Sequence, residues 1–165
     1  MRNFQDESKN GQEKEYDTQR YIEFNIGVER YALELLTVLE VISIPNTTPI
    51  PNSPNYMVGL MNLRGKIISI VDVRKKLGIK PLDNNSESAV IILKVKETSI
   101  GIIVDSINRV LQVGKNDVDN ALEVRGQSNA QFIDGIYHKE EKMTFLLSPY
   151  KLFAADIAFV DEKAA

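Results

Sequence analysis

The chain has 165 residues, of which 43% are hydrophobic and 26% charged, and its formal net charge is −3 at pH 7. These values are ordinary for a globular protein of one domain, or of two small subdomains that share a core. The absence of cysteine excludes disulfides, thiolate nucleophiles and zinc–thiolate sites. No apolar run reaches the ~20 residues of a membrane span. We therefore expect a cytoplasmic protein that does not insert into a membrane.

The first half of the chain predicts a tail followed by β-structure. Residues 1–19 are polar and charged, so they cannot offset the entropy lost on ordering, and we expect a disordered tail. Residues 34–44 have apolar side chains at three-residue spacing, which allows a helical turn that leads into a strand. Asp72 can cap a short helix that ends before Gly78. The predicted strands span 21–26, 30–33, 56–63 and 67–71, with an extended proline-rich loop at 45–54.

The second half predicts another set of strands and a terminal helix. Residues 105–113 repeat the apolar spacing of 34–44, and residues 114–131 form a looser segment. Ser148 and Pro149 favour a helix start, and this helix runs to about residue 160, before a short tail at 161–165. The predicted strands span 89–95, 99–104, 132–137 and 143–147.

The two halves also resemble each other in the order of their motifs. The series Leu35, Val38, Val41 matches the series Val104, Ile107, Val110. The strand, turn, strand, helix series at 58–77 matches the one at 134–153, with Gly59 opposite Gly135 in the alignment. The repeat predicts a mainly β fold of two small, closed or nearly closed β-barrels of about five strands each, joined around 78–88.

A search for catalytic motifs finds no metalloprotease helix, nucleophile elbow, dinucleotide fingerprint or P-loop. The single histidine, His138, lies in a charged turn without an obvious partner. No EF-hand loop is present. We therefore expect no catalytic residue, no metal and no cofactor, and an unrecognised enzyme remains the alternative, because catalytic geometry is spatial.

A nucleic-acid-binding barrel is a second alternative. It would need a basic groove lined with exposed aromatic side chains. Aromatic residues make up only 7% of the chain, and the one basic run, Arg74–Lys75–Lys76, is typical of the solvated face of a short helix. We therefore expect no nucleic-acid partner.

Arg64 is the most informative charged residue, because it sits in a turn between two strongly apolar strands with Gly65 beside it. An arginine at such a tip can bind a carboxylate through two parallel hydrogen bonds. Glu40 is the carboxylate that we expect it to meet. The alternative is an arginine that is simply solvated.

The segment around Arg64 resembles a family signature. Residues 62–67 (Asn-Leu-Arg-Gly-Lys-Ile), followed by Val-Asp-Val-Arg at 71–74, resemble the N-L-R-G-x-I … V-D-L-R core of CheW-like proteins. Segments at 31–33, 38–41 and 101–105 resemble further family motifs in the same order, so the resemblance covers about residues 20–160. Ser69 departs from the pattern, because the family usually has proline there.

This resemblance implies two intertwined five-stranded β-barrels with a hydrophobic groove between them. It implies an adaptor that couples the cytoplasmic tips of chemoreceptors to the regulatory domain of a CheA-type histidine kinase, recruited to membrane-bound receptor arrays. An adaptor of a parallel chemosensory pathway, for twitching or gliding motility, is the alternative within the family. The implied kinase-binding residues are Val38, Glu40, Val41, Gly59, Arg64 and Gly65. The implied receptor-binding residues are Leu35, Ile102, Val104 and Ile107, for which core packing is an equal alternative.

Overall fold

The computed structural model describes residues 17–80, 83–120 and 129–164. Its strands are β1 (Thr18–Ile26), β2 (Glu29–Glu34), β3 (Val38–Ile42), β4 (Met57–Leu63), β5 (Lys66–Asp72), β6 (Ala89–Val95), β7 (Thr98–Val104), β8 (Ser106–Gly114), β9 (Val118–Asn120), β10 (Ile133–Lys139) and β11 (Lys142–Leu147). Its helices are α1 (Val73–Lys76) and α2 (Pro149–Ala164), and its 3-10 turns are η1 (Leu35–Thr37), η2 (Lys115–Asp117) and η4 (Ala130–Phe132).

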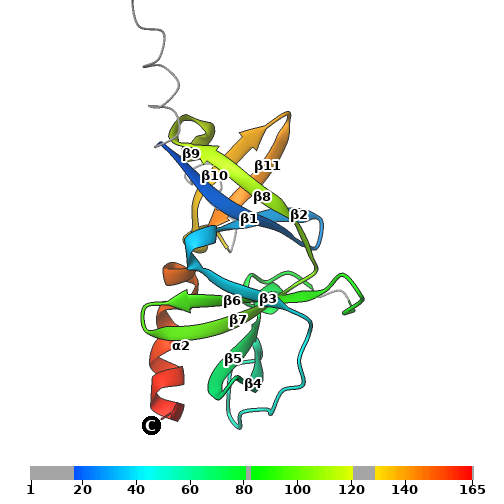
Figure 1. Ribbon diagram of the computed structural model, residues 1–165, viewed down its shortest axis with the longest axis vertical. Helices are drawn as coiled ribbons and strands as arrows, with labels where there is room; N and C mark the ends of the chain where they lie inside the picture. Colours follow the sequence, from blue (N-terminus) through cyan, green and yellow to red (C-terminus); the bar gives the residue numbers. More distant parts are fainter. Residues whose placement is uncertain (1–16, 81–82, 121–128, 165) are drawn as a thin grey trace, which may run out of the picture.

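The strands form two sheets that lie one above the other along the long axis of the molecule (Figure 1). One sheet has six strands in the order β8-β1-β2-β11-β10-β9, and the other has five in the order β3-β6-β7-β5-β4. From β1 and β2 in the six-stranded sheet, the chain crosses to the five-stranded sheet at β3 and returns at β8. Both sheets therefore contain strands from both halves of the predicted repeat.

The two sheets share one strand arrangement, which confirms the internal repeat. Each contains one parallel pair at the same place, β2 with β11 and β5 with β7. Register shifts fall at matching points of β4 and β10, beside Gly59 and Gly135. The strand β3 follows β2 but pairs with β6, and β8 follows β7 but pairs with β1. The two barrels are thus intertwined by the exchange of β3 and β8.

Each sheet is apolar on both faces, which explains why each one curls. One face of each sheet packs into a large core that the two sheets share, which includes Phe24, Tyr31 and Ile102. The opposite face of the five-stranded sheet packs its own cluster around Ile70 and Ile92. The six-stranded sheet does the same, with a cluster of Ala32, Leu111, Val113, Tyr137 and Leu146. A sheet that buries both faces without a second layer must enclose one of them, as a small barrel does.

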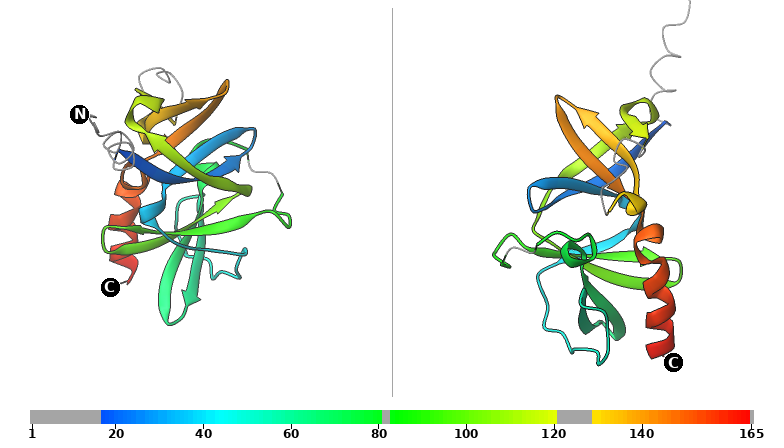
Figure 2. Two further views of the ribbon diagram at one scale, coloured as in Figure 1. Left: turned by 45° about the horizontal axis from the view of Figure 1, so that its top comes forward. Right: turned by 180° about the vertical axis from the view of Figure 1, so that it is seen from behind.

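Helix α2 continues from β11 and lies beside the five-stranded sheet, which Figure 2 shows from two sides. Its Asp156 is buried and accepts hydrogen bonds from the Tyr56 hydroxyl and the Lys76 ammonium group. The same ammonium group lies 4.2 Å from the centre of the Tyr56 ring. These contacts fix the terminal helix of one half of the repeat onto the sheet formed mainly by the other half.

Three predicted boundaries differ from the structure. Strand β1 begins at Thr18, because residues 18 and 19 pair with the end of β8, so the predicted tail is two residues too long; residues 1–16 lie outside the described residues. The looser segment at 114–131 contains the short strand β9, which makes the first sheet six-stranded rather than five-stranded. Helix α2 extends to Ala164, through most of the tail predicted at 161–165. Among the described helices, none has the length and apolar character needed to cross a membrane.

Candidate partner-binding surface

The tip of the β4–β5 hairpin presents Arg64 at the surface. Arg64 and Gly65 both have positive φ, at 52° and 86°, and Leu63 pairs with Lys66 across the turn. Two central residues of this kind match the right-handed twist of the flanking strands. The Asn62 Oδ1 atom accepts a hydrogen bond of 2.9 Å from the Gly65 N–H group, which closes the turn. Gly65 thus supplies the conformation that projects the neighbouring arginine.

Arg64 and Glu40 form the bidentate pair that the sequence predicted. The Arg64 Nη1 and Nη2 atoms donate to the Glu40 Oε1 and Oε2 atoms at 2.8 Å and 3.0 Å. This hydrogen bonding to Glu40 raises the pKa of the Arg64 guanidinium above its usual range. Glu40 lies on β3 and Arg64 on the β4–β5 hairpin, so the pair links the two strands at opposite ends of the five-strand order.

A hollow of about 390 Å³ lies beside the pair. Its floor contains Ile68 and Ile92, and its wall on β3 is Leu39, whose side chain is 54% exposed. Val41, two residues along the same strand, is 43% exposed. We call this surface the Glu40–Arg64 face, and its members are Leu39, Glu40, Leu63, Arg64, Gly65 and Lys66. Val41 pairs with Ile91, whereas Glu40 pairs with Ile92, so the Val41 side chain lies on the other side of β3. The face combines the exposed aliphatic side chain of Leu39 with a charge pair of fixed geometry.

The remaining residues implied for kinase binding lie deeper. Val38 is half-buried against the shared core. Gly59 is buried, and a Cβ atom there would lie 2.5 Å from the backbone oxygen of Thr48. Gly59 therefore allows the loop before β4 to approach the hairpin, rather than offering a side chain to a partner. Sequence reasoning missed Leu39, Leu63 and Lys66. The sequence feature that could have pointed to them is their position beside Glu40 and Arg64 along the chain.

The residues implied for receptor binding divide into two pairs. Ile102 and Val104 are 0% exposed and pack in the shared core between the sheets. Leu35 and Ile107 are half-buried at the border of the same core, Leu35 on η1 and Ile107 on β8. A partner can reach the second pair without any change in the packing of the sheets.

Arg74 is the centre of a buried ion-pair network, so the prediction of a solvated basic face was wrong. Its guanidinium binds Asp72 through Nε at 2.8 Å and Nη2 at 2.9 Å, and Asp105 through Nη1 at 2.9 Å. Hydrogen bonding to Asp72 is the main cause that raises the pKa of Arg74. The Lys76 side chain is only 9% exposed and lies against Asp156, so Lys75 is the one residue of the run that is exposed. One exposed cation is too little to neutralise a nucleic-acid backbone.

His138 also differs from the prediction, since its Nε2 atom lies 3.0 Å from the Asp119 carboxylate on the neighbouring strand β9. Both side chains are exposed, so the contact joins two surface strands. Within the described ranges, no three His, Cys, Asp or Glu side chains are grouped so as to hold a metal ion.

Comparison with known proteins places this geometry in a family. Residues 20–156 match the family described as "CheW-like domain". The chain is 30% identical over 133 residues to a "Probable chemotaxis protein CheW" of Rhizobium etli, covering 81% of this chain and 86% of the relative. It is 30% identical over 138 residues to "Chemotaxis protein CheW" of Treponema pallidum, covering 81% of each.

A solved structure supports the same assignment. The crystal structure of the "scaffolding protein TtCheW" from Thermoanaerobacter tengcongensis aligns with a TM-score of 0.76 at 29% identity, over 82% of this chain and 92% of that protein. The family match spans most of the chain and includes both sheets and the Glu40–Arg64 face. The chain therefore belongs to the CheW family.

Proposed function

We propose that the protein is a chemotaxis adaptor without a catalytic step of its own, which holds a CheA-type histidine kinase and the cytoplasmic tips of chemoreceptors in one assembly. Its place would be the cytoplasm, at membrane-bound receptor arrays. The observation that carries the proposal is the bidentate Glu40–Arg64 pair, held at the surface among exposed aliphatic side chains. Membership of the CheW family, and the relatives named as chemotaxis proteins, support it.

The Glu40–Arg64 face has the chemistry of a protein-docking surface. Arginine is among the residue types that most often dominate binding energy at interfaces, and the exposed aliphatic side chains beside it supply apolar area that a partner can bury. The pair also fixes the arginine before a partner arrives, so less side-chain entropy is lost on binding. We propose this face as the kinase-binding surface, with Val38 and Gly59 acting from beneath by positioning β3 and the loop before β4.

For the receptor, we propose the border between the two sheets. Leu35 and Ile107 are half-buried there and can be covered further by an apolar helix. Ile102 and Val104 support this border from within the core. A scaffold of this kind transmits a signal only if its contacts differ between the two receptor states.

The kinase assignment is tested by calorimetry of the full chain with the regulatory domain of the cognate CheA-type kinase. We expect Arg64→Ala to weaken binding at least about tenfold, as for a truncated interface arginine. The matched control is Arg20→Ala, which removes an exposed arginine at the start of β1 in the other sheet. Full-strength binding by the Arg64 variant would refute the assignment of this face.

A further inference from the structure

The internal repeat assigns a counterpart to the Glu40–Arg64 face in the six-stranded sheet. Val41 pairs with Ile91 in one sheet, and its repeat equivalent Val110 pairs with Ile22 in the other. Glu40 precedes Val41 and Arg109 precedes Val110, so Glu40 and Arg109 are equivalent. Ile92 follows Ile91 and Glu23 follows Ile22, so Ile92 and Glu23 are equivalent.

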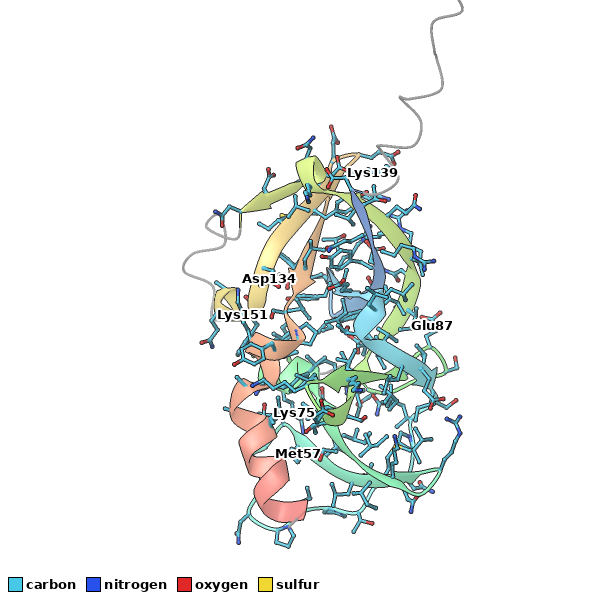
Figure 3. All side chains as sticks on the ribbon, turned by 60° about the vertical axis from the view of Figure 1, so that its left-hand side comes forward. Met57, Lys75, Glu87, Asp134, Lys139 and Lys151 are labelled. Carbon is cyan, nitrogen blue, oxygen red and sulfur yellow. The ribbon has the colours of Figure 1, made fainter. Side chains whose placement is uncertain are left out.

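The hairpins align in the same way. Lys66 closes the β4–β5 turn opposite Leu63, and Lys142 closes the β10–β11 turn opposite Lys139. Arg64 is therefore equivalent to Glu140. Figure 1 shows the two hairpins at opposite ends of the molecule, and Lys139 marks the second one in Figure 3.

A second hollow lies at this equivalent position, but its chemistry is different. It has a volume of about 430 Å³. The apolar floor residue Ile92 is replaced by Glu23, which is 2% exposed, and the wall residue Ser99 by Arg30. Its lining consists of Glu23, Asn25, Gly27, Val28, Arg30, Asn108, Arg109 and Lys142.

The buried carboxylate of this second hollow is already satisfied. Glu23 Oε1 accepts a 2.7 Å hydrogen bond from the Thr144 hydroxyl, and Glu23 Oε2 lies 3.2 Å from Arg109 Nε. Arg109 thus binds Glu23 in the floor of its hollow. In the other barrel, the equivalent residue Glu40 instead pairs with Arg64 on the hairpin. Arg30 and Lys142 form no ion pair with any residue of the described ranges. The lining therefore carries three cations and one carboxylate, and Arg109 already neutralises that carboxylate.

Exposed aliphatic side chains stand at the rim. Val28, in the β1–β2 turn, is fully exposed, and Met143 at the start of β11 is 44% exposed. Val28 lines the second hollow, and both Val28 and Met143 line a smaller adjoining hollow of about 240 Å³ beside Arg30 and Lys142. A basic hollow with an aliphatic rim, in a chain of net charge −3, complements an acidic segment that carries aliphatic side chains.

We propose that this hollow is a second protein-docking surface, distinct from the Glu40–Arg64 face, and that it takes an acidic, aliphatic segment of a partner protein through Arg30, Lys142 and Val28. The carboxylates of that segment bind Arg30 and Lys142, which form no ion pair within the described residues, and its aliphatic groups cover Val28 and Met143. A nucleic acid is less well matched, since it would place phosphates against an aliphatic rim and offer nothing to cover it.

The test is a titration of the isotope-labelled full chain, followed by NMR, with a peptide of repeated Glu-Glu-Leu units. We expect shift changes centred on Val28, Arg30 and Lys142, and no comparable change with the matched Gln-Gln-Leu peptide. The double variant Arg30→Gln/Lys142→Gln should bind the acidic peptide at least about tenfold more weakly, because two charge-assisted contacts are lost. The control Arg20→Gln/Lys94→Gln, which removes two exposed cations elsewhere, should bind as the parent does.

Several results would overturn the proposal. One is the absence of shift changes at these residues at millimolar acidic peptide, and another is equal binding by the parent and the double variant. Inorganic phosphate that binds as well as the peptide would identify a small-anion site instead, and a single-stranded oligonucleotide that binds better would identify a nucleic-acid site. The double variant should retain kinase binding, so failure here is distinguishable from failure of the Glu40–Arg64 face.

Discussion

Arg74 Nη1 lies 2.9 Å from Asp105 Oδ1, and this contact ties the end of β5 to the point where the chain leaves β7 for β8. The other oxygen of the same carboxylate accepts a 2.6 Å hydrogen bond from the Gly27 N–H group in the β1–β2 turn. One buried guanidinium therefore connects the five-stranded sheet, the crossover strand and the six-stranded sheet. The two sequence motifs that end in Arg74 and Asp105 meet in space at this joint.

Arg74→Ala should destabilise the protein strongly. It leaves Asp72 and Asp105 without their cation, and removal of one member of a buried pair costs about 3–5 kcal/mol. Urea unfolding followed by circular dichroism measures the loss. Lys75→Ala, on the next residue of the same short helix but exposed, is the control and should change the free energy of unfolding by less than about 0.5 kcal/mol. Similar losses in both variants would contradict the role of the network.

Reversing both charges of the Glu40–Arg64 pair separates a role in positioning the β4–β5 hairpin from a role in direct contact with the kinase. We expect Glu40→Arg/Arg64→Glu to restore the ion pair, and with it the hydrogen-exchange protection of the β4–β5 hairpin that either single reversal weakens. Kinase binding should stay weak, because the partner then meets a surface of opposite charge order. Full recovery of binding would mean that the pair acts only by positioning the hairpin.

The Arg74–Lys75–Lys76 run shows why sequence reasoning failed at some positions. Apolar, β-branched runs predicted the strands, because each sheet places apolar side chains on both faces, and the cap residue Asp72 predicted the short helix. The same reasoning treats three adjacent cations as solvated, since burial of a cation is visible only once its carboxylate is located. Asp72 lies only two residues before Arg74 but equally gave no sign of burial, while Asp105 is 31 residues from Arg74 and Asp156 is 80 residues from Lys76. Strand β9 was missed because its three residues carry little periodic signal.

Ser69 holds a buried hydroxyl that has no hydrogen-bond partner among the described residues. Ser69→Ala should raise the free energy of unfolding by roughly 1 kcal/mol, because it removes a desolvated polar group from β5. Ser148→Ala is the matched comparison, since the Ser148 hydroxyl accepts a 3.2 Å hydrogen bond from the Lys151 N–H group at the start of α2. That substitution should lower stability by about 1 kcal/mol. Denaturant unfolding of both variants checks the opposite signs.

Stability should fall at alkaline pH through Tyr31. Burial, and then the hydrogen bond to Glu29, raise the pKa of the Tyr31 hydroxyl above its ordinary value of 10.0. A group whose pKa is raised in the folded state contributes stability that is complete below pH 10 and is lost as the pH rises through the folded pKa. The urea midpoint should therefore drop above about pH 10, and Tyr31→Phe should reduce the drop. An unchanged drop in this variant would assign the effect to other groups.

The candidate site was predictable where one feature of the sequence was unusual. Arg64 stood out because a charged residue with a neighbouring glycine interrupted two apolar strands, and the structure confirms its pair with Glu40. Exposed and buried aliphatic residues looked alike, so Val104 could not be distinguished from Leu35 before its burial was seen. The second hollow was not predicted, because the repeat equivalence of Glu40 and Arg109 requires the pairing register of both sheets.

The exchange of β3 and β8 also bears on how the chain can be divided. If the backbone were cut between Leu77 and Ala89, each fragment would keep a strand whose hydrogen-bonding partner belongs to the other fragment. Neither fragment could complete a sheet, so both would expose strand edges and aggregate when made alone. When the two fragments are mixed, pairing of β3 with β6 and of β8 with β1 would favour their reassembly, as in a split reporter. We therefore expect the duplicated halves to fold as a single cooperative unit, although each half has the plan of a barrel.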